Sequence, residues 1–352
     1  MSAPIIAFFN NKGGVGKTSL VYHLSWMYAD MGLKVLAADL DPQANLTAAF
    51  LEEELLEEFW PDGEHNKTVY GSIEPLLRGV GDILASPHAE EIDERIHLLV
   101  GDLALSRFED ELSQQWPLCL DKKERAFRVM SAFWRVIMRV VEQKNIDIVL
   151  IDLGPNLGAI NRAVLVAADY LVIPLIPDLF SLQGLKNLGP FIRDLREEWR
   201  VRRDRNPAKN LPLPEGRMEP LGYIIMQHVE KLGRPVRAYE RWAEKIPIVY
   251  AEYVLNLETN SNIKTDDDQL GLIKHYRSLM PMAQEAHKPI FHLLPADGAI
   301  GSHQKAVFDA RDNFKQLAVE IAERCDITNP WISNTKKRIL ISKIFARNNS
   351  NR

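Results

Sequence analysis

An apolar run followed at once by a loop rich in glycine and lysine is the feature that most constrains the fold of this chain. Residues 5–9 read Ile-Ile-Ala-Phe-Phe, and residues 10–19 read Asn-Asn-Lys-Gly-Gly-Val-Gly-Lys-Thr-Ser. Leu20 and Leu24 then share one face at helical spacing, which predicts a buried strand, a tight turn and a helix that begins near Lys17. A strand, loop and helix in this order are typical of α/β proteins with a mostly parallel sheet.

The residues of the loop suit the binding of phosphate. Its glycines allow successive backbone N–H groups to point at one phosphate chain, and the N-terminus of the following helix adds positive charge. Lys17 can reach the outer phosphates, and the hydroxyl of Thr18 is placed to bind Mg²⁺. The spacing is that of Gly-x-x-x-x-Gly-Lys-Thr, except that Asn11 replaces the first glycine. The alternative, a glycine-lysine turn without a ligand, is disfavoured by the strand and helix around it.

A second lysine, Lys12, precedes the glycine pair, whereas one nucleotide needs only one such lysine from its own chain. We therefore expect Lys12 to be able to reach the phosphates of a nucleotide that a facing subunit holds. The predicted nucleotide-binding residues of the loop are Asn11, Lys12, Gly13, Gly14, Val15, Gly16, Lys17, Thr18 and Ser19.

Three motifs resemble those of the ParA/MinD superfamily of dimerising ATPases. Residues 12–18, Lys-Gly-Gly-Val-Gly-Lys-Thr, are similar to the deviant phosphate loop of that superfamily. Residues 39–47, Asp-Leu-Asp-Pro-Gln-Ala-Asn-Leu-Thr, resemble the second motif of its ParA branch. The apolar residues 148–151, which end at Asp152, are similar to its Walker B strand.

The resemblance implies roles for individual residues. Asp41 would position the attacking water, Asp39 would support the magnesium shell, and Asp152 would act on Mg²⁺ through water. Contacts to adenine are implied for the loop that contains Pro295 and Asp297. An alternative for the two aspartates of the second motif is that they only cap a strand. The catalytic candidates are therefore Lys12, Lys17 and Asp41, and the metal candidates are Thr18, Asp39 and Asp152.

The segment after Asp152 departs from the ParA pattern. That branch usually continues Asp-x-Pro-Pro, whereas residues 152–155 here read Asp-Leu-Gly-Pro. Gly154 replaces one proline, and we expect this switch segment to be more flexible than in related proteins.

Composition indicates an ordinary globular protein of 352 residues, with 46% hydrophobic and 26% charged residues. The formal net charge of −5 means that any surface for nucleic acid must be local. Cys119 and Cys325 are far apart and form no metal or redox motif, which fits a reducing compartment. The first predicted strand leaves no room for a signal peptide, and no apolar stretch has the length of a membrane span. The expected location is cytoplasmic.

One doubly wound domain is expected over residues 1–330, with a mostly parallel sheet of about seven or eight strands flanked by helices. Helical insertions are expected at about 51–145 and 228–289, including helices near 239–242 and 272–276. Residues 266–268 are three aspartates, and we interpret them as a helix cap in preference to a metal site. Further predicted elements are one helix over 126–143, strands at 34–38, 96–100, 147–152, 170–177, 221–226 and 290–294, and a closing helix over 304–325.

Two groups of basic residues are candidates for binding DNA. The first is the arginine-rich end of the helix around residues 191–205, although a solvated face of salt bridges is an equally good interpretation. The second is the outward side of the closing helix. The candidate residues are Arg200, Arg202, Arg203, Arg205, Lys305, Arg311 and Lys315.

The C-terminal residues 331–352 form a basic tail in which residues 334–347 have an imperfect amphipathic pattern. Such a pattern is typical of a helix that lies on a membrane surface, and it resembles in character the membrane-targeting tail of the MinD branch. The same cations would also suit DNA phosphates, and a docked or disordered tail is the common alternative.

The resemblance implies a Mg²⁺-dependent ATPase that forms a homodimer on ATP, binds nonspecific DNA and hydrolyses ATP slowly when a ParB-like or other partner stimulates it. Such a protein would partition or position DNA or protein cargo near the nucleoid. A MinD-like ATPase at the membrane surface is the second hypothesis. The third is a metabolic enzyme on the same scaffold, although no cysteine pair supports an iron-sulfur reductase and no second substrate motif supports a ligase.

Overall fold

The computed structural model describes residues 3–228, 230–231, 234–235, 241–258 and 267–333. Its main sheet has eight strands in the order β10-β7-β6-β1-β5-β2-β4-β3, and all neighbours are parallel except β3 and β4. This agrees with the predicted doubly wound α/β fold. The strands are β1 Ile5–Phe8, β2 Val35–Asp39, β3 Glu90–Asp93, β4 Ile96–Leu99, β5 Ile148–Asp152, β6 Tyr170–Leu175, β7 Glu219–His228 and β10 Gln269–Lys274; β8 Glu230–Lys231 and β9 Arg234–Pro235 pair separately.

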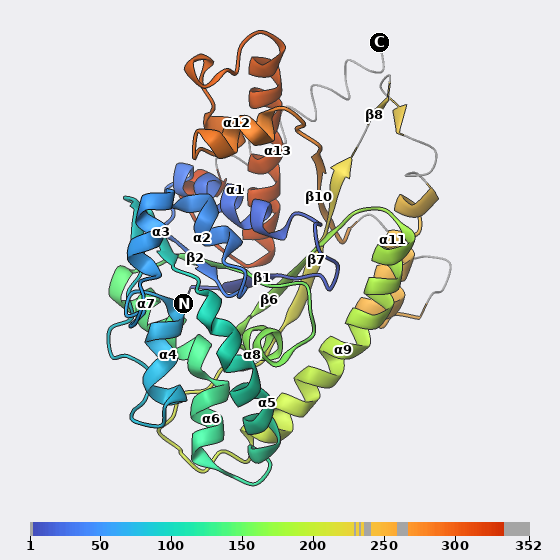
Figure 1. The fold of residues 1–352 in the computed structure, drawn as a ribbon. Helices are drawn as coiled ribbons and strands as arrows, with labels where there is room; N and C mark the ends of the chain where they lie inside the picture. Colours follow the sequence, from blue (N-terminus) through green and yellow to red (C-terminus); the bar gives the residue numbers. More distant parts are fainter. Residues whose placement is uncertain (1–2, 229, 232–233, 236–240, 259–266, 334–352) are drawn as a thin grey trace.

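Helices cover both faces of the sheet (Figure 1). The α-helices are α1 Lys17–Asp30, α2 Asn45–Phe50, α3 Glu53–Phe59, α4 Val69–Leu77, α5 Phe108–Leu118, α6 Glu124–Met130, α7 Ala132–Lys144, α8 Ala159–Ala167, α9 Leu179–Arg203, α11 Ile246–Val249, α12 Leu279–Glu285 and α13 Ser302–Arg324. Shorter helical turns are η1 Leu103–Arg107, η2 Tyr250–Val254, η3 Ile290–His292 and η4 Pro295–Asp297. No helix in the described ranges is long and apolar enough to cross a membrane.

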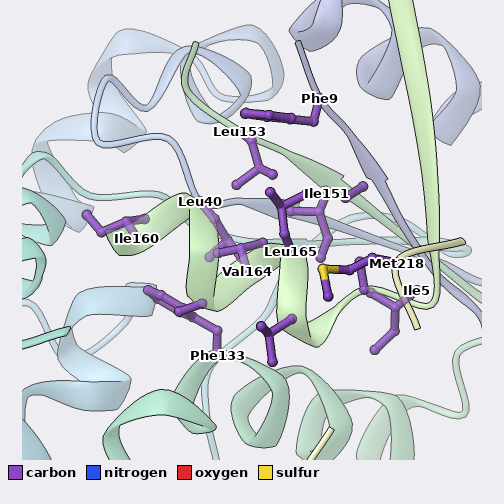
Figure 2. Close-up of a cluster of buried hydrophobic side chains, with 14 of the residues drawn as sticks. Ile5, Phe9, Leu40, Phe133, Ile151, Leu153, Ile160, Val164, Leu165 and Met218 are labelled. Carbon is purple, nitrogen blue, oxygen red and sulfur yellow. The ribbon is translucent and has the colours of Figure 1, made fainter. Parts of the chain in front are cut away.

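The two core layers follow from the alternation of side chains along the central strands. In β1, Ile5 and Ala7 face one layer while Ile6 and Phe8 face the other, and all four are buried. The first layer packs against α4 to α9, and Figure 2 shows part of it, with Leu40, Val164 and Phe133 among the labelled side chains. The second layer packs against α1, α2 and α13. A parallel strand that is covered on both faces is expected to be apolar throughout, as residues 5–8 are.

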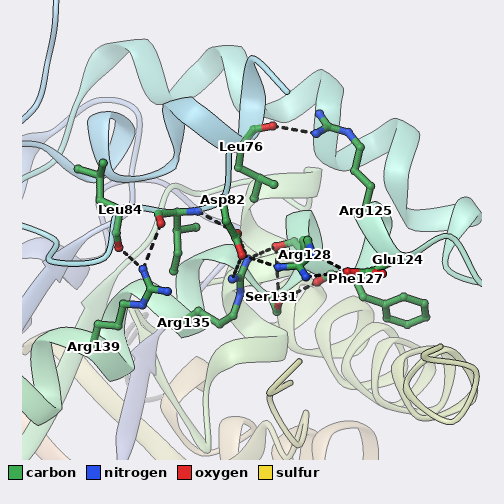
Figure 3. Close-up of polar contacts among 11 residues, drawn as sticks. Leu76, Asp82, Leu84, Glu124, Arg125, Phe127, Arg128, Ser131, Arg135 and Arg139 are labelled. Atoms are coloured by element: carbon green, nitrogen blue, oxygen red, sulfur yellow. Dashed lines mark hydrogen bonds and ion pairs between the residues drawn. The ribbon is translucent and has the colours of Figure 1, made fainter. Parts of the chain in front are cut away.

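A carboxylate fastens the loop after α4 to α7. Asp82 accepts hydrogen bonds from both terminal nitrogens of Arg135 at 2.8 Å and from Arg128 at 2.6 Å (Figure 3). Burial opposes ionisation of Asp82, but the hydrogen bonds from Arg135 and the amide of Ile83 lower its pKa to about 2. This part of the chain was predicted as a helical insertion, and the ion pairs hold its helices together.

Several predicted elements differ in the structure. The helix over 126–143 is divided into α6 and α7 at Ser131, whose hydroxyl donates to the carbonyl of Phe127 at 2.7 Å. The predicted strand at 290–294 is the short turn η3. Ile290 and Phe291 pack between helices and belong to neither sheet of the described residues. The last strand is β10, where a helix was expected near 272–276.

Two other predictions are only partly covered by the described residues. Asp267 and Asp268 precede the strand β10, so the predicted helix cap is wrong for these two aspartates, and Asp266 lies outside the described residues. The expected helix near 239–242 lies partly outside them, and the amphipathic tail 334–352 lies wholly outside them.

Candidate functional site

The glycine-rich loop joins the end of β1 to the start of α1 and needs glycine at two positions. Gly14 and Gly16 have φ values of +70° and +88°, a region that other residues rarely adopt. Gly16 is also the residue before the first turn of α1, so the loop turns directly into the helix N-terminus. The predicted strand, loop and helix are therefore present, and the helix begins at Lys17 as expected.

A cavity of about 740 Å³ lies over this loop. Residues 13–19 form one wall, and Asp41, Gln43 and Pro155 from the ends of neighbouring strands form another. The third wall was not predicted, since it comes from a segment that was interpreted as an insertion and carries no motif. It consists of Met280, Ala283, Gln284, His287 and Lys288, in and just after α12.

Lys17 is held in a largely buried position at the base of the cavity. Its side chain is buried, and its Nζ donates to the carbonyl of Asn10 at 3.4 Å. Burial lowers the pKa of Lys17, while the nearby charges of Asp152 and Asp41 raise it in part. A desolvated cation beside a ring of backbone N–H groups strongly favours a polyanion such as a triphosphate.

Thr18 and Asp152 supply the kind of oxygen ligands that suit Mg²⁺. The Thr18 hydroxyl donates to Asp152 Oδ2 at 2.6 Å, which brings the first turn of α1 to the end of β5. Burial raises the pKa of Asp152 to about 8, and the charge of Asp39 adds to this effect. A divalent cation would offset the cost of this buried carboxylate, and hydroxyl and carboxylate oxygens are ligands that Mg²⁺ accepts. These two residues therefore fit the ion.

Asp39 makes different contacts from those that the resemblance implied. Its Oδ2 accepts hydrogen bonds from the amide and the hydroxyl of Thr47, both at 2.8 Å, and the Thr47 hydroxyl accepts the amide of Gly101 at 2.8 Å. Burial raises the pKa of Asp39 to about 7. Asp39 is absent from the cavity wall and ties β2 to α2, so its place in a magnesium shell stays a prediction.

Asp41 lies at the cavity wall and is closely approached by the switch segment. Its Oδ1 accepts the amide of Gln43 at 3.0 Å, and a Cβ atom at Gly154 would lie 3.1 Å from that same oxygen. Gly154 therefore lets the segment pass beside Asp41, a packing reason that sequence reasoning missed when it assigned only flexibility. The segment is also tethered, because Asn161 in α8 donates to the carbonyl of Gly154 at 2.8 Å.

The N-terminus of α8, just after the switch segment, is capped from a distant helix. Glu109 of α5 accepts hydrogen bonds from the amides of Ala159 and Ile160, the latter at 2.8 Å. A carboxylate satisfies these free N–H groups and is favoured by the helix dipole. No local pattern predicts this contact, since α8 begins after Gly158 without a side-chain cap of its own.

Lys12, Pro295 and Asp297 are not among the residues that line the cavity. Lys12 forms an ion pair with Asp178, the residue before α9. Asp297 accepts hydrogen bonds from Lys288 Nζ at 2.8 and 3.0 Å, so it reaches the cavity wall only through that lysine. The predicted adenine contacts stay a prediction.

Arg202 is a buried residue, and its prediction as a DNA contact is wrong. Its guanidinium lies 4.1 Å from the centre of the Trp116 ring, and its Nε donates to the carbonyl of Trp116 at 3.0 Å. Arg200 is exposed and pairs with Glu197.

The other DNA candidates keep at least part of their side chains accessible. Arg203 and Arg205 donate to backbone carbonyls, those of Glu215 and Leu120. On α13, Lys305 and Arg311 are exposed and Lys315 is half-buried. The arginines end α9 beside α5, whereas the α13 residues lie in the half of that helix that packs with α12.

His23 is a buried residue of the cavity wall that sequence reasoning missed. Its Nδ1 donates to the carbonyl of Ser19 at 2.7 Å, and its Nε2 accepts the amide of Ile290 at 3.2 Å. Burial lowers its pKa to about 4. Protonation would also remove the hydrogen bond from Ile290, so the neutral ring is the form that fits.

We expect the nucleotide-free protein to lose stability as the pH falls from 6.5 toward 4, because unfolded His23 takes up a proton that the folded protein excludes. At pH 5.5 the loss relative to pH 7.5 is about 1 kcal/mol from this residue alone. Urea unfolding at the two pH values measures it. His23→Gln is the matched variant, and an equal pH dependence in both proteins would contradict the role of His23.

Comparison with known proteins gives consistent matches. A family model described as an AAA domain (AAA_31) matches residues 3–204. A protein of Methanocaldococcus jannaschii is 27% identical over 69% of this chain and 80% of its own length. The sporulation initiation inhibitor protein Soj of Bacillus subtilis is 28% identical over 54% of this chain and 64% of Soj. The cell division protein PomZ of Myxococcus xanthus is 29% identical over 54% of this chain and 52% of PomZ, so the match spans about half of that relative.

Solved structures match over nearly the whole chain. A protein from Corynebacterium diphtheriae has a TM-score of 0.70 and 25% identity, with 92% of this chain and 98% of that chain covered. An ATP complex of a variant of McdA from Cyanothece has a TM-score of 0.63 and 15% identity, with 93% and 98% covered. At this low identity, the likeness to McdA establishes the shared fold alone.

Proposed function

Because this chain belongs to the ParA/MinD superfamily of P-loop ATPases, through the AAA domain family that matches residues 3–204, we propose that it dimerises when it binds ATP. The ATP-bound dimer binds DNA without sequence preference. A partner protein stimulates slow ATP hydrolysis and releases the dimer from DNA. The cycle partitions or positions a DNA or protein cargo in the cell.

The observation that carries the proposal is the convergence of three groups on one cavity. Lys17 and the N–H groups of the loop would receive the phosphates. Thr18 lines the cavity and Asp152 lies behind it, joined to its hydroxyl, so that the pair would hold Mg²⁺. Bound there, Mg²⁺ would neutralise phosphate charge during transfer. Asp41 is the carboxylate in the wall that would orient water, because Asp39 and Asp152 are engaged by the side chains of Thr47 and Thr18. The amide of Gln43 contacts only Oδ1 of Asp41.

Soj and PomZ, whose names refer to sporulation control and cell division, support a role in positioning. A structural neighbour described as a plasmid partition protein from Borrelia burgdorferi, bound to AMPPNP, has a TM-score of 0.55 and 20% identity. The proposed DNA surface consists of the exposed Lys305 and Arg311 on α13, with Arg203 and Arg205 as a second group.

Co-sedimentation distinguishes DNA from membrane as the surface on which the protein acts. We expect the protein to sediment with nonspecific duplex DNA only when ATP is present, and not with vesicles that contain anionic lipid. Each phosphate contact should steepen the dependence of log affinity on log salt by about 0.9. Deletion of residues 334–352 should leave DNA binding intact. Binding to vesicles that is lost on this deletion would instead favour the membrane-surface ATPase.

A further inference from the structure

Lys12, the lysine that distinguishes this loop, is held by its own chain. Its Nζ pairs with Oδ2 of Asp178, which is the N-cap residue of α9. The other carboxylate oxygen of Asp178 accepts the amide of Ser181 at 2.8 Å. The side chains of Lys12 and Asp178 keep 26% and 33% of their surface exposed, so the pair is open to exchange.

We propose that Asp178 is a positioning residue that holds Lys12 in the free subunit and gives it up when two subunits close over nucleotide. This inference rests on the proposed function, because it needs an ATP-bound dimer. It adds a competitor for Lys12 within the chain, so that the strength of one ion pair sets how readily the dimer forms.

The start of the loop is fixed in a way that directs Lys12 toward α9. Asn10 donates from its amide group to the carbonyl of Pro174 in β6 at 2.7 Å and accepts the amide of Lys12 at 3.0 Å. Asn11 lies against α9, because its Oδ1 would be 2.9 Å from a Cβ atom at Gly184. Lys12 therefore leaves the loop on the side of α9, away from the cavity that Lys17 faces.

The surface next to the ion pair is apolar and uncovered in the single chain. Leu179 and Phe180 follow Asp178 directly, and they are 56% and 73% exposed. A second copy of this chain that covered them would also remove water from Lys12 and Asp178. A triphosphate carries several negative charges, so it competes well with one carboxylate for a lysine in such a site.

The acidity of Asp178 agrees with this arrangement. Burial opposes its ionisation, but the hydrogen bonds from Lys12 and from the Ser181 amide hold its pKa below the usual value. The carboxylate is therefore charged at neutral pH and available as the counter-ion of Lys12.

The variant Asp178→Asn tests the proposal, because asparagine caps a helix as well as aspartate but carries no charge. The matched control is Glu197→Gln, which removes an exposed ion pair with Arg200 on the same helix. Two measurements are made on the full chain. The first is the rate at which an amine-acylating reagent labels Lys12 without nucleotide, followed by mass spectrometry. The second is the ATP-dependent dimerisation constant from analytical ultracentrifugation.

We expect the reagent to label Lys12 faster in Asp178→Asn than in wild type. We also expect this variant to dimerise more tightly on ATP. An ion pair of this exposure is worth about 2- to 5-fold in each subunit, which multiplies to about 4- to 25-fold for a dimer that releases two. Glu197→Gln should match wild type in both measurements, and all three proteins should melt at similar temperatures.

Equal labelling of Lys12 in wild type and Asp178→Asn would overturn the proposal and leave the proposed function untouched. Faster labelling with an unchanged dimerisation constant would overturn it too, because the ion pair would then not compete with the dimer. A wild-type protein that stays monomeric with ATP would overturn the proposed function itself, and the labelling result would still report on the pair.

Discussion

Asp41→Ala is expected to stop ATP turnover while the ATP-bound dimer still forms. Asp41 lies in the cavity wall, and a general base or a water-orienting carboxylate typically contributes about 10²- to 10⁴-fold to the rate. The loop with Lys17 and Thr18, and Asp152 behind Thr18, would hold the nucleotide through their own contacts, which the substitution leaves in place. We therefore expect hydrolysis to fall by at least about 100-fold with little change in nucleotide affinity. Phosphate release and analytical ultracentrifugation with ATP measure the two effects.

Asp41→Asn is the matched control for this prediction. Asparagine keeps the size of the side chain and can still accept the amide of Gln43, so only the charge is lost. Loss of turnover in both variants assigns the effect to the carboxylate. Turnover in Asp41→Ala within a few-fold of wild type would remove Asp41 from the mechanism.

Lys12→Ala is expected to abolish the ATP-bound dimer and hydrolysis, although the single chain still binds nucleotide. A cation supplied across an interface to a transferring phosphoryl group contributes about 10³- to 10⁵-fold. Lys17→Ala is the contrasting variant, because loss of the lysine at the base of the cavity should remove nucleotide binding altogether. Equilibrium binding of a fluorescent ATP analogue distinguishes the two variants, because only Lys12→Ala should still bind it.

Mixing two inactive variants tests whether Lys12 acts on the neighbouring subunit. In a dimer of Lys12→Ala with Asp41→Ala, the site in the first subunit keeps its own Asp41 and receives Lys12 from the second. Hydrolysis should therefore reappear in the mixture and be absent from each variant alone. A mixture that stays inactive, although dimers that contain both variants are detected, would mean that Lys12 acts within its own chain.

The central strands of the sheet could be predicted from the sequence, whereas the strand β10 at its edge could not. Buried strands of a parallel sheet are continuous apolar runs, so β1, β2, β5 and β6 could be predicted from composition alone. At the edge, β10 carries buried and half-buried residues in an irregular order, which fits a helix equally well. Ile290 and Phe291 have the composition of a strand, but neighbouring helices bury them instead.

The candidate site also has a part that the sequence predicts, its motif residues, and a part that it does not, the long-range partners of these residues. The loop and the aspartates after β2 and β5 belong to local motifs, and the sheet brings them to one edge. The partners of these residues come from far along the chain, as with Lys12 and Asp178, and no spacing rule links residues at such a separation. Arg202 shows a further limit, because an arginine whose guanidinium lies over the Trp116 ring and donates to backbone carbonyls looks in sequence like any surface cation.

The position of β1 between β5 and β6 has a consequence for how the protein tolerates change. The three segments that bear Lys12, Asp152 and Asp178 leave neighbouring strands in the best-protected part of the sheet. A replacement that removes a methyl group from β1, such as Ile6→Val, would weaken the packing beneath all three segments, because Ile6 is fully buried. The side chains of β3 at the margin are half-buried or exposed. Related proteins should therefore differ most in sequence at the outer strand β3 and least at β1, where the lysine loop begins.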